Sequence, residues 1–259
     1  MDLQATIKRM QAACTISQCS EDKYKCEECM DTTWIINENN VCTRCECYEK
    51  RIIENAWSRF GVKPEEVAKV NDYKPFDDVT YEVKNKAIKY IQNFDGIKKG
   101  KENSFGLFGQ PGAGKSHLVI AIGAALLNRQ EKFIKVVYMP YEEVIRDLKA
   151  NAMDDENYIK IQSKYCRAEL LIMDDLFKSK VKNNKLIAEL NSSDIKHIYP
   201  IINYRYLNKL PVLVSSECTP QMLIELDEAI ARRILEMCGD NITVFKGIKY
   251  NYSLKKFIK

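Results

Sequence analysis

The sequence lacks any long hydrophobic run. If glycine is disregarded, the longest continuous apolar stretch is Leu118 to Leu127, far shorter than the roughly 20 apolar residues that cross a bilayer as a helix. The first residues carry an early acid, Asp2, and no apolar core of a secretory leader, so we expect no signal peptide. These absences lead us to expect a soluble, cytoplasmic protein that has no membrane partner.

The sequence also lacks a strong charge of either sign. Its net charge is +4 over 259 residues, so composition alone does not indicate a nucleic-acid-binding protein, and any DNA contact has to come from local clusters. It contains no internal repeat and no low-complexity stretch. With 46% apolar residues, the chain can form one sizeable α/β core and a small appendage.

A glycine-rich motif, Gly109-Gln-Pro-Gly-Ala-Gly-Lys-Ser116, lies between the apolar run 105–108 and the helix-forming run 118–127. This order of strand, loop and helix is what a phosphate-binding loop requires. The glycines allow backbone N–H groups to surround a triphosphate, and the start of the helix directs its positive dipole end at the β-phosphate. Lys115 would neutralise phosphate charge and Ser116 would hold Mg²⁺. The alternative is a turn that binds nothing, and the flanking sequence argues against it.

An acidic motif, Leu-Leu-Ile-Met-Asp174-Asp175, follows at a suitable distance. Four apolar residues in a row suit a strand buried on both faces of a parallel sheet, and such sheets bind ligands at the carboxyl ends of their strands. Asp174 would hold Mg²⁺ through water, and Asp175 would orient or deprotonate the attacking water. Two aspartates in a row also occur in ordinary turns, but the preceding glycine loop favours a nucleotide site.

Ten cysteines in a cytosolic chain indicate metal ligands before they indicate disulfides. Cys26 and Cys29 form one Cys-x-x-Cys pair, and Cys42, Cys45 and Cys47 follow after a gap of hairpin length. Two such pairs are typical of a zinc ribbon, in which the metal supplies most of the folding energy. Zinc takes four ligands and five cysteines are present, so only the first pair is firm, and spacing favours Cys42 with Cys45. Reduced cysteines without metal are the alternative.

The remaining chain predicts alternating strands and helices, as in a doubly wound parallel sheet. Helical spacing predicts a helix that starts near Tyr48 and ends at Gly61, and Lys63-Pro-Glu-Glu66 predicts the start of another helix. We expect a zinc-binding module (1–50), a helical linker (51–74) and an ATPase domain (75–259). In that domain we expect strands at 105–108, 132–139, 170–173, 211–215 and 242–245, and helices at 85–94, 118–127, 140–150, 157–167, 195–207 and 229–238, with another helix capped by Thr219.

Four lysines follow the acidic strand at positions 178, 180, 182 and 185. We expect this run to be solvated rather than to contact DNA. The strand at 211–215 leads into Ser215-Ser216-Glu217, and a polar side chain there could touch the γ-phosphate or the attacking water.

In chain order, Gly-Gln-Pro-Gly-Ala-Gly-Lys-Ser, Leu-Leu-Ile-Met-Asp-Asp, Leu-Val-Ser-Ser-Glu and Ala-Arg-Arg-Ile resemble the AAA+ ATPase of the DnaC/DnaI-type replicative helicase loaders, in the version found in phages and prophages of Gram-positive bacteria. The upstream cysteines, with Arg44-Cys-Glu-Cys-Tyr48, are similar to the zinc-binding amino-terminal module of those loaders. The resemblance covers nearly the whole chain from about residue 23. It implies an α/β AAA+ P-loop fold and the zinc ligands Cys26, Cys29, Cys45 and Cys47.

The resemblance also implies roles for individual residues. Asp175 would position water, and Arg233 stands where the family places the arginine finger that completes a neighbouring subunit's site, with Arg232 as the alternative. The implied partners are a hexameric replicative helicase, single-stranded DNA and further copies of this chain. The residues expected to bind ATP and Mg²⁺ are Gly109, Gly112, Ala113, Gly114, Lys115, Ser116, His117 and Asp174.

Two departures from the family pattern matter. Glu217 stands where the first sensor usually has asparagine, and an acid beside a γ-phosphate is unfavourable unless it contacts water or a lysine. Near the carboxyl terminus, where related loaders tend to carry arginines, this chain has Ser253 and Lys255. A weakened second sensor predicts slow or switch-like hydrolysis.

We therefore expect an ATPase that loads a replicative helicase onto single-stranded DNA as replication begins. Three alternatives stay open at this point. A transposition-helper AAA+ ATPase shares the core but recruits a transposase. A P-loop kinase for a small metabolite would need a basic lid over an acceptor pocket, and a non-catalytic zinc adaptor would have lost the use of Lys115, Ser116 and Asp174.

Overall fold

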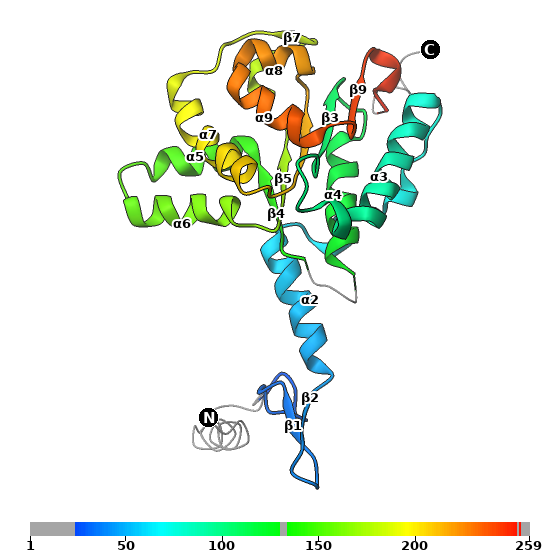
Figure 1. Ribbon diagram of the computed structural model, residues 1–259, viewed down its shortest axis with the longest axis vertical. Coiled ribbons are helices and arrows are strands. Elements are labelled where there is room, and N and C mark those ends of the chain that lie inside the picture. The colour runs from blue at the N-terminus through cyan, green and yellow to red at the C-terminus, as the bar shows by residue number, and fades with distance from the viewer. Residues whose placement is uncertain (1–23, 130–133, 253, 255–259) are drawn as a thin grey trace. The chain divides into compact units, whose positions relative to one another are not determined.

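The computed structural model describes residues 24–129, 134–252 and 254. The chain divides into two compact units, Met1–Asn55 and Ala56–Lys259, whose helices and strands are drawn in Figure 1. The expectations for residues 1–22, Ser253 and Lys255 lie outside the described residues. No described helix combines the length and apolar composition that crossing a bilayer requires.

The smaller unit is built around a short antiparallel hairpin. Strand β1 (Trp34–Ile36) pairs with β2 (Cys42–Arg44), so that Trp34 lies opposite Arg44. The Arg44 guanidinium lies 3.7 Å from the centre of the Trp34 ring and 4.0 Å from that of Tyr48, a double cation–π contact. Helix α2 (Cys47–Phe60) follows directly, and its residues from Ala56 onward belong to the larger unit.

The larger unit contains a five-stranded parallel sheet. Its strands lie in the order β4-β5-β8-β3-β9. The three central strands are buried along their whole length, as continuous apolar runs predict. The strand bounds are β3 (Phe105–Gly109), β4 (Val136–Pro140), β5 (Leu170–Asp174), β8 (Val212–Ser216) and β9 (Ile242–Phe245).

Helices cover both faces of this sheet and form two hydrophobic cores. Helices α3 and α4 pack over one face, and α5, α6, α7, α8 and α9 pack over the other (Figure 1). Alternate residues of each strand point into opposite cores, as Leu170 and Leu171 do. The helix bounds are α3 (Asp78–Ile97), α4 (Lys115–Leu127), α5 (Tyr141–Ala150), α6 (Asp155–Cys166), α7 (Ser192–Leu207), α8 (Pro220–Leu226) and α9 (Glu228–Cys238).

One helix expectation is wrong, and one helix is longer than expected. The proline after Lys63 starts only a 3-10 turn, η1 (Pro64–Glu66), and a second turn, η2 (Val70–Asp72), follows, because this segment packs its few apolar residues onto the ATPase core instead of extending a helix. Helix α3 starts well before residue 85, because the Asp77 carboxylate accepts the Thr80 N–H and so caps a new amino terminus. Thr219 caps α8 as predicted, through the Met222 N–H.

The segment after β5 was expected to be a solvated run of lysines, and that expectation is wrong in part. A 3-10 turn, η3 (Lys178–Lys180), leads into a hairpin of β6 (Val181–Lys182) and β7 (Lys185–Leu186). Lys180 is largely buried and pairs with the Asp194 carboxylate at 3.0 Å. Lys178 and the two hairpin lysines, at 182 and 185, are exposed as expected.

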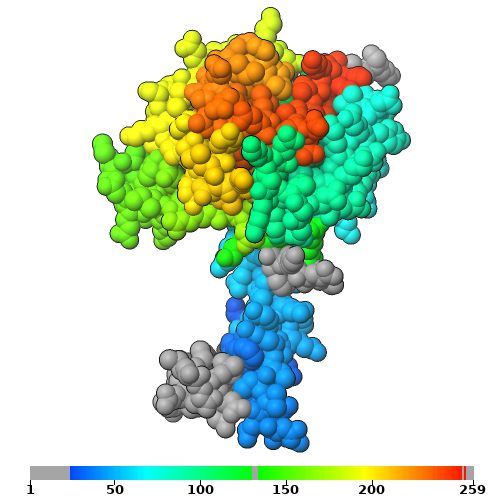
Figure 2. All heavy atoms as spheres, in the orientation of Figure 1, coloured from blue at the N-terminus to red at the C-terminus, as the bar shows by residue number. Residues whose placement is uncertain are grey.

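The carboxyl-terminal segment returns to the start of α3. After β9, the 3-10 turn η4 (Ile248–Tyr250) places Lys249 Nζ 2.9 Å from Asp77 Oδ2. The Tyr250 ring packs on Phe76 and Phe245. In the space-filling view the two segments lie side by side, the first in red and the second in cyan (Figure 2).

A fully buried arginine joins helix α7 to the beginning of β8. Arg205 is 0% exposed, and its guanidinium donates to the backbone carbonyls of Tyr165, Cys166, Ala168 and Pro211 at 2.7–3.1 Å. Burial lowers the pKa of Arg205 to about 9. The side chain thus ties the end of α6 and the loop before β5 to the loop before β8.

Candidate nucleotide site and cysteine cluster

The glycine loop connects β3 to α4 and has the backbone geometry of a phosphate cradle. Gly109, Gly112 and Gly114 all have positive φ, between 72° and 95°, a region that L side chains rarely adopt. A Cβ atom on Gly112 would also lie 2.4 Å from the Asn251 side chain. Helix α4 begins directly afterwards at Lys115, so the unpaired N–H groups of its first turn face the loop.

Lys115 is folded back onto the loop. Its ammonium donates to the carbonyl oxygens of Gly109 and Gln110, both at 2.8 Å, and the residue is 6% exposed. Burial lowers the pKa of Lys115 to about 8, although the negative charges of Glu217, Asp175 and Asp174 act in the opposite direction. These three carboxylates therefore lie near the lysine, as a shared nucleotide site requires.

The two aspartates at the end of β5 are held differently. The Asp174 carboxylate is buried, accepts the Tyr138 hydroxyl at 2.8 Å and accepts a short hydrogen bond from Ser215. Asp175 has a left-handed backbone, with φ at 54°, and its N–H donates to the Ser215 hydroxyl at 3.0 Å. Ser215 on the adjacent strand β8 therefore contacts both acidic residues and fixes their relative position.

Lys178 pairs with the second of these aspartates. Its ammonium lies 2.6 Å from the Asp175 carboxylate, and this hydrogen bond raises the pKa of Lys178. Glu217 lies nearby and adds to the same shift. Lys178 thus provides positive charge near Glu217, the acid expected at the first-sensor position. Such a charge is the condition under which an acid can be tolerated beside phosphate.

These side chains surround one cavity of about 540 Å³. Its first wall is made by the glycine loop and the start of α4, and its second by the strand ends and η3. A third wall comes from the segment before α3 and from the carboxyl-terminal segment. The three sets are Pro111, Gly112, Gly114, Lys115, Ser116 and His117; Asp175, Lys178 and Glu217; and Asp72, Tyr73, Lys74 and Tyr252.

Some expected site residues lie outside this lining. Gly109, Ala113 and Asp174 belong to the loop and strand behind the cavity. Arg233 lies on α9, where it donates to the Asn203 side chain at 3.0 Å and to the Tyr199 hydroxyl at 2.9 Å. A residue outside the cavity of its own subunit is what a finger acting on a neighbouring subunit requires.

Arg232, the alternative finger, is more exposed. Its guanidinium pairs with Glu236 on the same helix at 3.1 Å. Arg233, in contrast, is also stacked near the Tyr199 and Tyr206 rings, at 5.0 and 5.6 Å. Contacts with α7 therefore orient Arg233 far more than they orient Arg232.

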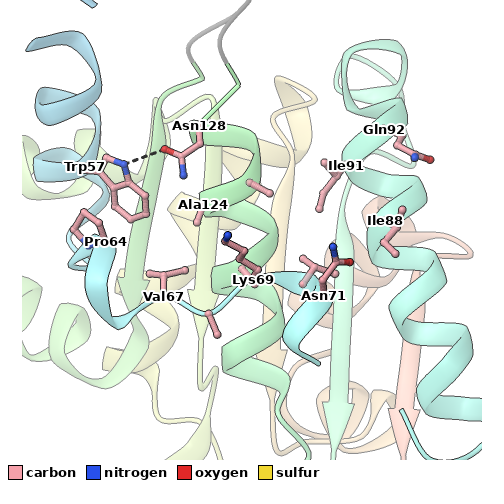
Figure 3. A pocket seen from close by; sticks show the side chains of 14 residues that line it. Trp57, Pro64, Val67, Lys69, Asn71, Ile88, Ile91, Gln92, Ala124 and Asn128 are labelled. Atoms are coloured by element: carbon pink, nitrogen blue, oxygen red, sulfur yellow. Dashed lines mark hydrogen bonds between the residues drawn. The ribbon is translucent and has the colours of Figure 1, made fainter. Parts of the chain in front are cut away.

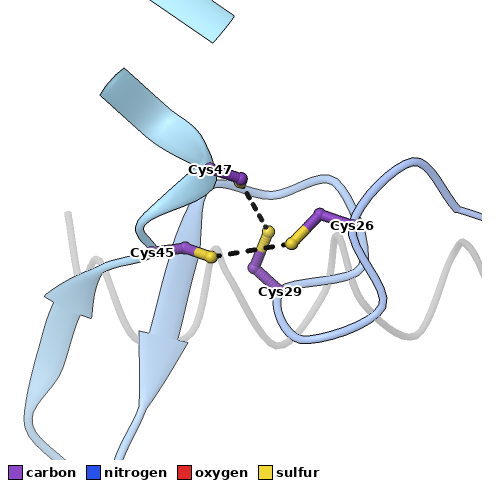
Figure 4. Close-up of side chains that lie close together, drawn as sticks. All are labelled: Cys26, Cys29, Cys45 and Cys47. Atoms are coloured by element: carbon purple, nitrogen blue, oxygen red, sulfur yellow. Dashed lines mark hydrogen bonds between the residues drawn. The ribbon is translucent and has the colours of Figure 1, made fainter. Parts of the chain in front are cut away.

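In the smaller unit, four cysteines converge. The sulfur atoms of Cys26, Cys29, Cys45 and Cys47 all lie within 4.8 Å of one another, and Figure 4 shows them facing a common centre. The distances between Cys26 and Cys45 and between Cys29 and Cys47 are 3.6 and 3.4 Å, close to the ~3.8 Å that sulfurs bonded to one tetrahedral zinc at ~2.3 Å would keep. Cys42 lies in β2, outside this cluster.

A separate, larger cavity is mostly apolar. It measures about 640 Å³ and lies between residues 57–71, α3 and α4. Figure 3 shows its lining and the hydrogen bond from the Trp57 indole to the Asn128 side chain, 3.1 Å long. The aliphatic side chains of Val67, Ile88 and Ile91 dominate the lining, and it contains no residue of the glycine loop, so it is unsuited to a triphosphate.

Sequence reasoning missed three side chains that shape the nucleotide site. Tyr138 and Lys178 were not assigned to it, and Ser215 was considered only as a possible phosphate contact. Lys178 carries a detectable signal, because it follows Asp175 by three residues and the two can meet across a turn. Tyr138 has no such signal, since its contact with Asp174 depends on the pairing of β4 with β5.

Comparison with known proteins was made on sequence and on structure. The bacterial DnaA ATPase domain matches residues 76–238. The chain is similar to the phage-like element PBSX protein XkdC of Bacillus subtilis (strain 168), with 32% identity over 242 residues that cover 88% of this chain and 85% of that protein.

Two solved structures show the same fold. A crystal structure of DnaI superposes with a TM-score of 0.57 and 21% identity, over 71% of this chain and 95% of that one. A crystal structure of the DnaC helicase loader gives a TM-score of 0.51 and 19% identity, over 74% and 99%. With the strand order, these matches confirm the predicted AAA+ P-loop fold and, at the level of fold, the resemblance to DnaC/DnaI-type loaders.

Proposed function

Because the chain belongs to the family of the bacterial DnaA ATPase domain, and its larger unit is therefore an AAA+ ATPase, we propose that it loads a hexameric replicative helicase onto single-stranded DNA. In this function ATP binding and hydrolysis control how tightly the protein binds its partners. A cytoplasmic location, where the DNA is, forms part of the proposal.

One observation supports this function above the others. A single chain carries a nucleotide cavity in one compact unit and a four-thiol cluster in another. The pairing suits a protein that holds a partner with one unit and responds to nucleotide with the other. The fold it shares with the DnaC helicase loader adds to this argument.

The nucleotide roles follow from the geometry. The loop amides and the α4 amino terminus would surround the β-phosphate, and Lys115 would exchange its bonds to the Gly109 and Gln110 carbonyls for bonds to phosphate oxygens. Ser116 and the buried Asp174 carboxylate suit Mg²⁺, which prefers oxygen ligands and often keeps its waters. When bound, Mg²⁺ supplies positive charge at the phosphates during transfer.

Hydrolysis would use Asp175 and the neighbouring subunit. The oxygen of water bonds to the γ-phosphorus while the bond to the β–γ bridging oxygen breaks, and ADP leaves with that electron pair. Asp175 orients the water and accepts its proton. Arg233 of an adjacent copy would stabilise the charge that develops in this step, so assembly and hydrolysis depend on each other.

The cysteine unit would hold zinc and bind the helicase. Four thiols at the observed spacing are a closed donor set of the kind that structural zinc sites use. Zinc would order the hairpin and the start of α2 on which Arg44 is stacked between Trp34 and Tyr48. This surface, on which Arg44 is exposed, is where we propose the contact with the helicase.

The test is a loading assay on circular single-stranded DNA. Such DNA has no end, so a closed helicase ring cannot thread onto it without a loader. Purified protein, a candidate hexameric helicase and either ATP or a slowly hydrolysed analogue are mixed, and helicase retained on the DNA is measured. We expect retention to depend on the protein and on ATP, and to be lost in Lys115→Ala. Lys182→Ala, which changes an exposed hairpin lysine, is the matched control.

Other outcomes point to the alternatives. Failure of every candidate helicase to be retained, together with capture of a transposase, would favour a transposition helper. ADP formation that depends on a small acceptor molecule would favour a kinase. Either result contradicts the loading proposal.

A further inference from the structure

Lys178 is positioned to take part in the ATPase reaction, although no phosphate-binding pattern includes it. Its side chain is about half exposed and lines the same cavity as Lys115, Ser116 and Glu217. Its ammonium lies 2.6 Å from Asp175, the residue proposed to activate water. A cation therefore lies beside the proposed general base in the lining of the nucleotide cavity.

The backbone holds Lys178 at the cavity. Asp175 and Phe177 both have left-handed backbones, with φ of 54° and 58°, and the Lys178 N–H donates to the Asp175 carbonyl at 3.1 Å. Phe177 is buried against the Tyr141 ring. The turn is thus anchored in the core, and only the long side chain of Lys178 remains free to change its partner.

The segment that Lys178 begins also contacts the glycine loop. At the tip of the β6–β7 hairpin, the Asn184 amide donates to the Gln110 side chain at 2.9 Å. Gln110 is also one of the two carbonyl acceptors of Lys115. The hairpin therefore bridges the end of β5 and the loop that would bind phosphate.

The charges around the phosphate end of the cavity favour a second cation from the protein. The carboxylates of Asp174, Asp175 and Glu217 all lie near Lys115 and Lys178. A γ-phosphate entering here adds more negative charge beside Glu217. Lys115 would bind phosphate from the loop, and the exposed ammonium of Lys178 can leave Asp175 to offset the added charge from the wall formed by the strand ends.

We propose that Lys178 is a γ-phosphate ligand that takes the place of the usual first-sensor asparagine. With ATP bound, its ammonium leaves Asp175, binds a γ-phosphate oxygen and shields that oxygen from Glu217. Asp175 is then free to accept the proton of the attacking water. With ADP bound, Lys178 stays paired with Asp175. This role rests on the proposed ATP hydrolysis in the cavity and is independent of the helicase partner.

The experiment compares nucleotides that differ in the γ-phosphate. Lys178→Met keeps the length of the side chain and removes its charge, and Lys178→Arg restores a charge. Affinities for a slowly hydrolysed ATP analogue and for ADP are measured by calorimetry, with steady-state hydrolysis in parallel. Lys182→Met, on the exposed hairpin, is the control, and thermal unfolding of each variant is recorded.

We expect Lys178→Met to bind the ATP analogue about 10- to 100-fold more weakly, the range of a charged hydrogen bond, while ADP affinity changes less than about twofold. Its kcat should fall by a similar factor, and Lys178→Arg should recover most of both. Equal losses for both nucleotides, unchanged discrimination, or faster hydrolysis would overturn the proposal. If Lys178→Met does not unfold cooperatively, the affinities of wild type and of Lys178→Arg for the ATP analogue and for ADP are compared instead. Loss of the discrimination between the two nucleotides in Lys178→Arg would then overturn the proposal. Loss of helicase loading with intact discrimination would contradict the proposed function alone.

Discussion

The two units of this chain are each stabilised in a different way. In the described part of the smaller unit only Cys29 and Cys45 are buried, and both belong to the thiol cluster. The larger unit has two apolar cores, one on each face of its sheet. The described part of the smaller unit buries too little apolar surface to fold by that alone, so we expect it to depend on a metal bound by its thiols, and we expect no such dependence in the larger unit.

Removal of metal should break this comparison most strongly. Zinc binding to small metal-dependent modules contributes about 10–16 kcal/mol in apparent terms, so chelation or Cys26→Ser should unfold residues 24–55. The main unfolding transition, which reports the sheet, should stay within about 2 °C. Metal content by mass spectrometry and amide hydrogen exchange measure the two effects.

Cys42→Ser is the matched control, because Cys42 lies outside the cluster. This variant should retain one zinc per chain. A wild-type protein without zinc, or loss of zinc in Cys42→Ser, would contradict the ligand set Cys26, Cys29, Cys45 and Cys47.

The larger unit should instead be sensitive to its buried arginine. Arg205→Met has a side chain of suitable volume but leaves the buried carbonyls without their donor. Each unsatisfied carbonyl costs about 1–3 kcal/mol. Removal of the buried charge offsets part of this cost. We expect the free energy of unfolding to fall by about 3 kcal/mol in chemical denaturation. Zinc content should not change.

The exposed ion pair on α9 provides the control for this substitution. Arg232→Met removes a pair with Glu236 that is about half exposed on both sides, so stability should change by less than about 0.5 kcal/mol. If the two substitutions have equal effects, the buried contacts of Arg205 do not support the larger unit.

The smallest effect should come from the titration of Lys115. Its pKa is about 8 in the folded protein and 10.5 ordinarily, so between these values the unfolded chain binds more protons than the folded one. Stability contributed by this group therefore rises with pH above 8. From pH 8 to 9, the free energy of unfolding of nucleotide-free protein should increase by about 1 kcal/mol relative to Lys115→Met. Parallel pH profiles of the two proteins would show instead that Lys115 stays charged throughout this range.

The sequence predicts the larger unit well because its strands are continuous apolar runs and its loop has three glycines with a lysine and serine. It predicts less where pairs distant in sequence decide the structure. The hairpin at 181–186 has two-residue strands, too short for any pattern. The donors to Asp174 come from two neighbouring strands, so they become visible only when the strand order is known.

In the cysteine unit, by contrast, the spacing of residues along the sequence does not identify the full set of ligands. Spacing favours Cys42 with Cys45, and the resemblance favours Cys45 with Cys47. The structure brings the second pair to the first two cysteines, because β2 ends at Arg44 and α2 begins at Cys47, so that both thiols sit at the turn between them. The spacing of the cysteines along the sequence does not predict that turn.

The positions of the two tryptophans have a practical consequence. Trp34 lies in the cysteine unit beneath the Arg44 guanidinium, and Trp57 lies in the larger unit, bonded to Asn128. Each unit thus carries its own intrinsic fluorophore. With Trp57→Phe the tryptophan emission reports only the cysteine unit, and with Trp34→Phe only the other, so that events in each half of one unlabelled chain can be followed by tryptophan fluorescence.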